Sequence, residues 1–435
     1  PPSSTEAPMT LPRSTAAILA AAAALALAGR VQAQTISEFP LAPRSSPAGI
    51  TAGPDGNAWF VEEHGDRVGR ISPSGVLAEF PLRNAGSFAR GITAGPDGAL
   101  WFTELPGRIG RVTTSGSMSE IDIPIRPAEP AGIVTGSDGN LWFADYYERI
   151  GRLTPSGALT YFTLPAGVGL RGIAAGPDGA IWFALSNVGR IGRLTPAGAL
   201  TQFQLPDAGS GPFGITAGAD GNLWFTEYST SRIGRLSPAG ALTEFPLAGG
   251  ATPYGITAGP DGNIWFTEYS LDRVARITPA GAITEFAIPT PGGSPAEIAA
   301  GPDGNVWFTE FNGDRIGRIS LHPSCTPDAT TLCLNGARFE ARVAWAVPSQ
   351  GSAGQAAAMG LTGDTGAYWF FTANNIELLV KVVDGRSFNG KFWVFAGALT
   401  DVRYTLTVRD VQTGAVRVYE HPAGVLESLA DTAAF

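Results

Sequence analysis

The stretch that decides the fold is residues 214–247, GITAGADGNLWFTEYSTSRIGRLSPAGALTEFPL. It contains four short segments in which apolar or small residues alternate with polar ones, the pattern of strands with one buried face. The dipeptides Asp220-Gly221 and Ala239-Gly240 fall between segments, where tight turns need residues that tolerate positive φ. The stretch therefore predicts a four-stranded antiparallel sheet.

The same unit recurs along residues 36–320, and its period indicates a closed ring of sheets. A repeat of about 41 residues with four strands is the size of a propeller blade. The last unit ends at Ile319 without its fourth strand, and an isolated copy of that strand, Ile36–Leu41, precedes the first unit. We therefore predict an all-β fold, a seven-bladed β-propeller closed by the N-terminal strand, since closure leaves no unpaired edge. The tryptophan of each unit stands at Trp59, Trp101, Trp142, Trp182, Trp224, Trp265 and Trp307.

The first 33 residues (1–33) have the pattern of a targeting segment. Met9 is interpreted as the initiator, after an upstream extension, and Arg13 places a positive charge ahead of the apolar run 16–28. Val31-Gln32-Ala33 then matches a signal-peptidase site. Because the apolar run is shorter than the roughly 20 residues that span a bilayer, we expect cleavage after Ala33. The mature protein is predicted to be exported, to the bacterial periplasm or outside the cell, without a membrane span.

The mature chain divides into two predicted domains. Residues 34–320 form the propeller, and residues 321–435 contain strand-like runs that favour a small C-terminal β-sandwich, similar to a module of bacterial secreted proteins. The chain has two cysteines, Cys325 and Cys333, both outside the repeats. In an exported protein such a pair is expected to form a disulfide across a short loop.

The charge balance narrows the range of partners. The chain has 29 Lys and Arg against 38 Asp and Glu, a formal net charge of −9. An acidic chain without a basic stripe argues against nucleic acid and anionic membranes as partners. We expect a monomer whose partner is a small molecule, or an extracellular protein or glycan. It should bind on the propeller face whose loops vary in length, because loops carry function on a rigid scaffold.

The repeats resemble those of the virginiamycin B lyase family, streptogramin-inactivating enzymes built as seven-bladed propellers. The resemblance lies in units such as GITAG at 91–95, WFTE at 307–310 and RIGR at 315–318, and covers about residues 36–320. It implies a lyase that opens a cyclic depsipeptide by elimination, with Mg²⁺ and a histidine base at the mouth of the channel. The family's two histidines precede the first strands of the last two blades, where this chain has Tyr254 and Ala296.

The missing histidines put catalysis in question, because elimination requires a base placed to abstract a proton, usually His near neutral pH. Glu310 retains an acid of the family pattern, and Tyr254 and His64 are the other weak catalytic candidates. Glu268 and Glu310 are weak candidates for Mg²⁺ ligands. Both belong to a set that ends the second strand of most blades, and a feature repeated in this way is interpreted as architecture, each acid pairing with an arginine of the third strand.

Departures from the repeat are better indicators of a single site. Arg90 and Arg171 stand where other blades have small or aromatic residues, and Glu297 replaces a glycine. These cations, together with neighbouring aromatic residues, predict a pocket with charged corners and aromatic walls. The alternative is that the arginines pair with nearby acids and the rings cap the blades. The predicted ligand-binding residues are Arg90, Arg171, Phe213, Tyr254, Glu297, Tyr146, Tyr228, Tyr269 and Phe311.

Two functions follow from these patterns. The first is a small-molecule or protein binding or scaffold protein that lacks the family's catalytic histidines. The second is a metal-dependent lyase, or a related hydrolase, with a rearranged centre.

Overall fold

The computed structural model describes residues 34–435 except Pro106, 322–324 and 373–374. The predicted targeting segment, residues 1–33, lies outside the described residues. Nearly all regular structure is strand, which confirms the all-β prediction. In the described part of the chain, no helix is long and apolar enough to cross a membrane.

The described residues from Ile36 to Ile319 form seven four-stranded antiparallel sheets. Six of these sheets are consecutive in the chain. They comprise β2 (Pro47–Ala52), β3 (Ala58–Glu62), β4 (Arg67–Ile71) and β5 (Leu77–Pro81); β6 (Ile92–Ala94), β7 (Leu100–Glu104), β8 (Arg108–Val112) and β9 (Met118–Asp122); β10 (Pro130–Thr135), β11 (Leu141–Asp145), β12 (Arg149–Leu153) and β13 (Leu159–Thr163); β14 (Leu170–Ala175), β15 (Ile181–Leu185), β16 (Arg190–Leu194) and β17 (Leu200–Gln204); β18 (Pro212–Ala217), β19 (Leu223–Glu227), β20 (Arg232–Leu236) and β21 (Leu242–Pro246); and β22 (Pro253–Ala258), β23 (Ile264–Glu268), β24 (Arg273–Ile277) and β25 (Ile283–Ala287).

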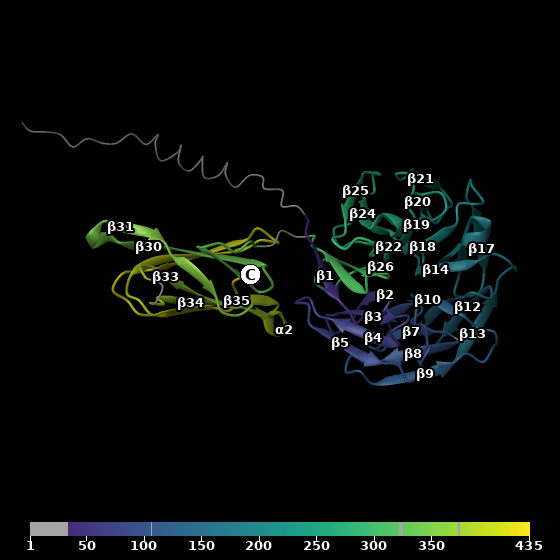
Figure 1. The fold of residues 1–435 in the computed structure, drawn as a ribbon, viewed down its shortest axis with the longest axis horizontal. Helices are drawn as coiled ribbons and strands as arrows, with labels where there is room; N and C mark the ends of the chain where they lie inside the picture. The colour runs from purple at the N-terminus through teal and green to yellow at the C-terminus, as the bar shows by residue number, and fades with distance from the viewer. Residues whose placement is uncertain (1–33, 106, 322–324, 373–374) are drawn as a thin grey trace, which may run out of the picture. The chain divides into compact units, whose positions relative to one another are not determined.

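The remaining sheet joins the two ends of the repeat region. It contains β26 (Pro295–Ala300), β27 (Val306–Glu310) and β28 (Arg315–Ile319), and β1 (Ile36–Pro40) pairs antiparallel with β28. The first strands of successive sheets contact one another, and β26 contacts β2, so the ring is closed (Figure 1). The N-terminal strand thus supplies the outer strand of the last blade, as predicted.

Each blade is fixed by its tryptophan, and six of the seven also by a glycine on the third strand, where β24 has Ala275 instead. Trp265 is fully buried, and its indole Nε1 donates to Asp261 Oδ1 at 3.0 Å, so the Asp-Gly turn is tied to the blade core. The same bond recurs in all seven sheets. Gly69 lies against Phe60 so closely that a Cβ would stand 2.1 Å from the ring. The glycine of the RxGR strand therefore leaves room for the phenylalanine ring in these six blades.

The C-terminal domain consists of two five-stranded sheets that share one hydrophobic core, which includes Phe339, Tyr368, Val380 and Leu406. One sheet contains β29 (Thr331–Leu334), β30 (Phe339–Val347), β31 (Ser352–Gln355), β36 (Arg403–Asp410) and β37 (Val416–His421). The other contains β32 (Ala357–Gly360), β33 (Thr365–Trp369), β34 (Leu378–Gly385), β35 (Lys391–Ala398) and β38 (Ser428–Asp431), with the short helix α2 (Arg386–Asn389) between β34 and β35.

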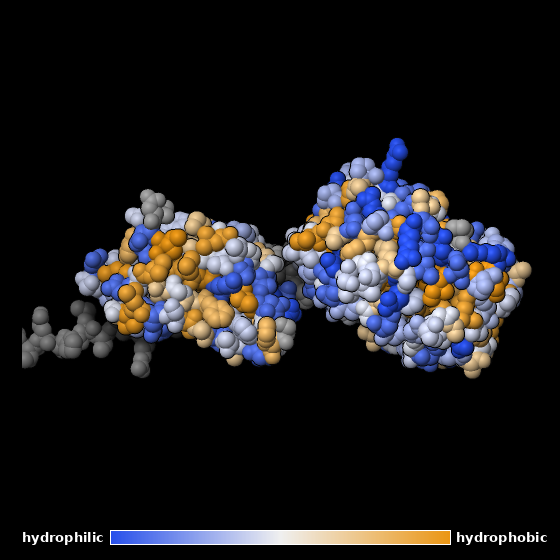
Figure 2. Space-filling model, turned by 90° about the horizontal axis from the view of Figure 1, so that it is seen from below, coloured by the Kyte–Doolittle hydropathy of each residue, from blue (hydrophilic) through white to orange (hydrophobic). Residues whose placement is uncertain are grey.

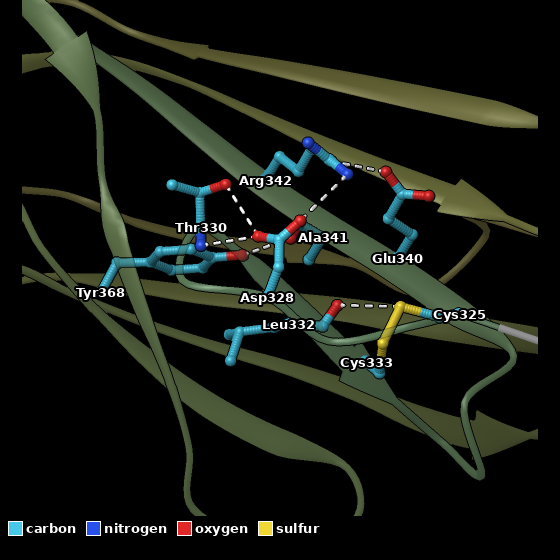
Figure 3. The surroundings of a disulfide bond; sticks show 9 residues. All are labelled: Cys325, Asp328, Thr330, Leu332, Cys333, Glu340, Ala341, Arg342 and Tyr368. Atoms are coloured by element: carbon cyan, nitrogen blue, oxygen red, sulfur yellow. Dashed lines mark hydrogen bonds and ion pairs between the residues drawn. A yellow bond between two sulfur atoms is a disulfide. The ribbon is translucent and has the colours of Figure 1, made fainter. Parts of the chain in front are cut away.

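The predicted disulfide is present at the start of this domain. Cys325 and Cys333 are bonded, with their Cα atoms 5.4 Å apart. Cys333 lies on β29, and the Cys325 sulfur lies 3.6 Å from the backbone oxygen of Leu332 (Figure 3). The bond ties the segment before β29 to the sheet.

Figure 2 shows hydrophilic and hydrophobic residues side by side on the visible surface.

Candidate functional site

A cavity of about 610 Å³ opens where the first strands of the seven sheets meet. Six of these strands shift register just before their central isoleucine, as between Pro47 and Ile50. Such a bulge re-aims the side chains beside it. The residues at the shift line the cavity, namely Ala48, Ala131, Arg171, Phe213, Tyr254 and Ala296, with Arg90 at the equivalent position before β6. The site is therefore built from the positions that vary between blades.

Two arginines on the cavity wall have different partners. Arg90 forms an ion pair with Glu63 at 3.2 Å, in agreement with the structural alternative for this residue. Arg171 has no ion pair and no side-chain hydrogen bond within the described residues, and its Nε is buried. Its guanidinium lies 5.3 Å from the ring centre of Tyr146 and 5.6 Å from that of Phe213. Aromatic faces thus hold Arg171 in place of an acid.

Aromatic side chains form one wall of the cavity. The rings of Phe213 and Tyr254 are 4.1 Å apart, and Tyr228 and Tyr269 lie 6.4 and 5.7 Å from Tyr254. Phe311 lines the cavity from the last blade. The predicted residues on β18 and β22 and in the loops after β19, β23 and β27 are therefore brought together.

Glu297 is the acid of the cavity lining that does not pair with an arginine among the described residues. Burial raises the pKa of its carboxyl to about 7, so it changes charge near neutral pH. Tyr254 lies close by, and burial, reinforced by the charges of Glu297 and Glu63, raises its pKa above the usual value for tyrosine. Tyr254 is therefore a hydrogen-bond donor at neutral pH and not a base.

The other predicted candidates lie away from the cavity wall. Tyr146 contacts Arg171 but does not line the cavity. His64 is an exposed loop residue whose ring lies 5.8 Å from Phe88 and 6.1 Å from Phe311. Glu268 and Glu310 are fully buried inside their blades. The structure does not bring these last three residues to the cavity.

The second-strand acids belong to a recurring arrangement inside the blades. Glu104 accepts a hydrogen bond from Arg108 at 2.8 Å, and Asp145 accepts one from Arg149 at 2.6 Å, in agreement with the predicted acid–arginine pairing. Glu310 instead lies beside a second acid, Glu38 of β1. Burial, with the charge of Glu38, raises the pKa of Glu310 to about 8. Acid pairs of this kind recur in five blades, as Glu62/Glu79, Glu104/Glu120, Glu227/Glu244, Glu268/Glu285 and Glu310/Glu38.

Sequence reasoning missed Glu63. A signal for it existed, because Glu63 follows the second-strand acid in its blade, as Tyr146, Tyr228, Tyr269 and Phe311 do in theirs. It is the one acid at this position in the seven blades, four of which have the predicted aromatic residues there and two of which have Leu105 and Ser186. Its pairing with Arg90 could not be predicted, since it joins loops of neighbouring blades.

The mouth does not fit the Mg²⁺ site that the resemblance implies. In the described residues, no group of three or more His, Cys, Asp or Glu side chains is placed to hold a metal ion. Of the two acids on the wall, Glu63 is neutralised by Arg90, which leaves Glu297 alone. Mg²⁺ requires octahedral oxygen ligands, usually including carboxylates. We therefore derive no chemical step through a metal.

The comparisons with known proteins agree with the propeller fold. The model of the virginiamycin B lyase family matches residues 9–170 and 166–331. A solved streptogramin B lyase is 34% identical with a TM-score of 0.64, covering 66% of this chain and 97% of that one. A catalytically inactive virginiamycin B lyase from Staphylococcus aureus, solved with quinupristin, is 35% identical with a TM-score of 0.63, covering 66% and 99%.

Two further matches are more limited. A virginiamycin B lyase from Bordetella bronchiseptica (strain ATCC BAA-588 / NCTC 13252 / RB50) is 39% identical over 51 residues, 12% of this chain and 17% of the relative. The match to this curated relative thus spans less than a fifth of its length. The WD40 propeller domain of Doa1, 12% identical with a TM-score of 0.56 over 66% of this chain and 95% of that one, shows the fold alone.

Proposed function

Because this chain belongs to the virginiamycin B lyase family, we propose that it is a small-molecule-binding propeller whose site is the cavity at the mouth of the ring. The observation that carries the proposal is the composition of the wall. It combines paired and unpaired charges with a four-ring aromatic cluster, and no histidine is among its described residues. Pockets of this size with few polar groups and aromatic walls are typical of ligand sites.

The first experiment asks whether the family's reaction persists. Quinupristin is incubated with residues 34–435, with and without Mg²⁺, and followed by chromatography and fragment-ion mass spectrometry, since elimination leaves the mass unchanged. We expect intact antibiotic at high protein concentration, because the mouth offers neither a histidine base nor a metal site. A linear product would contradict a binding role.

The second experiment asks whether the mouth binds ligands at all. A library of small polar aromatic compounds is screened by thermal shift against the wild type and Phe213→Ala, which removes the centre of the aromatic wall. We expect stabilising compounds whose effect is lost in Phe213→Ala and kept in Phe388→Ala, a control at a side chain of the other domain that is 81% exposed. Hits unaffected by Phe213→Ala would place binding elsewhere.

One observation favours the lyase as a second candidate. Glu297 lines the cavity and has a pKa of about 7, the range required of a general base near neutral pH. Any ring opening by the wild type should then be abolished in Glu297→Gln and should rise with pH through about 7 as the carboxyl ionises. Product formation that survives Glu297→Gln would exclude this carboxyl as the base.

We further propose that the protein acts outside the cytoplasm. The Cys325–Cys333 disulfide supports this location, because such bonds persist in oxidising compartments and are rare in the cytosol. Fractionation of a native host, with thiol labelling before and after reduction, tests it. We expect the oxidised protein outside the cytoplasmic fraction, and a reduced cytoplasmic pool would contradict export.

A further inference from the structure

The charges on the cavity wall do not balance. Arg90 is neutralised by Glu63, whereas Arg171 and Glu297 have no ion-pair partners in the part of the chain that the structure describes. Glu297 keeps its proton up to about pH 7 because it is buried. Below that pH, Arg171 supplies a positive charge that no acid of the wall cancels.

Arg171 is positioned to present its hydrogen-bond donors. The rings of Tyr146 and Phe213 contact the guanidinium, at 5.3 and 5.6 Å, and no acid or carbonyl among the described residues accepts from it. A guanidinium carries five N–H donors in one plane, and stacking on aromatic faces leaves the edges of that plane free. Such an edge matches the two oxygens of a carboxylate.

The surface next to Arg171 is formed by aromatic rings. Phe213 contacts Arg171 on one side and Tyr254 on the other, and Tyr228 and Tyr269 extend the wall from there. Aromatic rings of a ligand pack favourably on such faces. A planar body lying on this wall would bring an attached anionic group to Arg171.

All four charged residues of the wall act on one group, the Tyr254 hydroxyl. The ionisation of the Tyr254 hydroxyl is affected by Glu297 and Glu63, which raise its pKa, and by Arg90 and Arg171, which lower it. These four residues, with Tyr228, Tyr254 and Tyr269, are the titratable groups that line the cavity. The guanidinium, the carboxyl and the rings thus line the same cavity.

We propose that the mouth binds a planar aromatic compound that carries one anionic group, a carboxylate or an equivalent oxyanion, with the anion on Arg171 and the rings on the wall of Phe213 and Tyr254. This assignment rests on the proposed function of the cavity as a ligand site. The assignment also makes the affinity for the ligand depend on the protonation of Glu297. Glu297 is neutral below about pH 7 and repels the anion above it, so affinity falls as the pH rises.

The test uses three probes of one shape and different charge: 2-naphthoate, neutral 2-naphthamide and cationic 2-naphthylmethylamine. Dissociation constants are measured by calorimetry on residues 34–435 at pH 6 and pH 8. We expect 2-naphthoate to bind at least tenfold more tightly than the amide at pH 6, and the amine to bind most weakly. The preference for 2-naphthoate should shrink severalfold at pH 8.

Two variants assign the effect to residues. Arg171→Gln should lower the affinity for 2-naphthoate about tenfold and leave the amide unchanged, whereas Arg83→Gln, an exposed arginine that does not line the cavity, should change neither. Glu297→Gln should keep 2-naphthoate binding equal at pH 6 and pH 8.

The outcomes separate the two proposals. Equal binding of the three probes, lost in Phe213→Ala, would overturn the anion assignment and leave the cavity a ligand site. Binding of 2-naphthoate that survives Arg171→Gln, or no binding of any probe, would also overturn it. Failure of the cavity as a ligand site would show as library hits insensitive to Phe213→Ala.

Discussion

The buried acids inside the blades and the acid at the cavity mouth have similarly raised pKa values in different surroundings. Glu268, with a pKa of about 7, is fully buried, lies near Glu285 and Arg273, and belongs to an arrangement that recurs around the ring. Glu297 also has a pKa of about 7, but it lines a cavity and occurs once. A perturbed pKa thus indicates a site only where the group is accessible and departs from the repeat.

The largest expected difference between the two regions concerns packing. Trp265→Ala removes a fully buried ring that stacks on Phe286 and bonds to Asp261, and should cost about 3–5 kcal/mol of the free energy of unfolding. Phe213→Ala at the half-buried mouth should cost about 1 kcal/mol. Urea unfolding followed by tryptophan fluorescence checks both, and equal losses would contradict the division into scaffold and site.

The blade acids should make the propeller less stable as the pH rises. In the unfolded chain a glutamate ionises near pH 4.5, whereas Glu268 and Glu310 keep their protons to about pH 7 and 8. Between these pH values the folded state binds more protons than the unfolded state. The contribution of these two groups to the free energy of unfolding is therefore highest below pH 4.5 and falls towards pH 8. Glu310→Gln should therefore raise the free energy of unfolding by about 2 kcal/mol at pH 8 and change it little at pH 5. A loss at pH 8 would show that the carboxylate is stabilising.

Two blades lack this acid pair: one has Asp145 and Tyr161 at the equivalent positions, and the other offers a test of the same point. There the equivalent positions are Leu185 and Gln202, and Gln202 accepts from Arg190 at 2.9 Å. The double change Leu185→Glu with Gln202→Glu installs a new pair and should cost about 1–2 kcal/mol at pH 8. Chemical denaturation at pH 5 provides the comparison, where the cost should largely vanish.

The smallest expected effect concerns ligand affinity, which should depend on Glu297 of the cavity and not on Glu310 inside its blade. Glu310→Gln should leave the affinity for 2-naphthoate within twofold at both pH 6 and pH 8, because Glu310 does not reach the cavity. Glu297→Gln should remove the pH dependence. Calorimetry on the two variants checks this prediction. A changed affinity in Glu310→Gln would mean that the blade interior and the mouth are coupled.

Much of the propeller was predictable because its signals are local and repeated. The tryptophan period, the Asp-Gly turns and the orphan strand Ile36–Leu41 indicated the sheets and the pairing of β1 with β28. Departures from the repeat also identified Arg171, Tyr254 and Glu297, which line the cavity. The acid–arginine pairing was predicted for each blade that has the acid, but among the described residues Glu227, Glu268 and Glu310 form no ion pair with an arginine. The acid beside Glu310, Glu38, comes from the opposite end of the repeat region.

The sequence by itself determined the strands, their order and the ring of variable positions, because alternation and turn chemistry act between residues close in the chain. Only the tertiary structure decided which charges cancel. Glu63 reaches Arg90 from a neighbouring blade, while Arg171 meets aromatic faces instead of an acid. The physical reason is that the strength of a charge at a site depends on distances and burial between residues far apart in the chain, and closing the ring sets both.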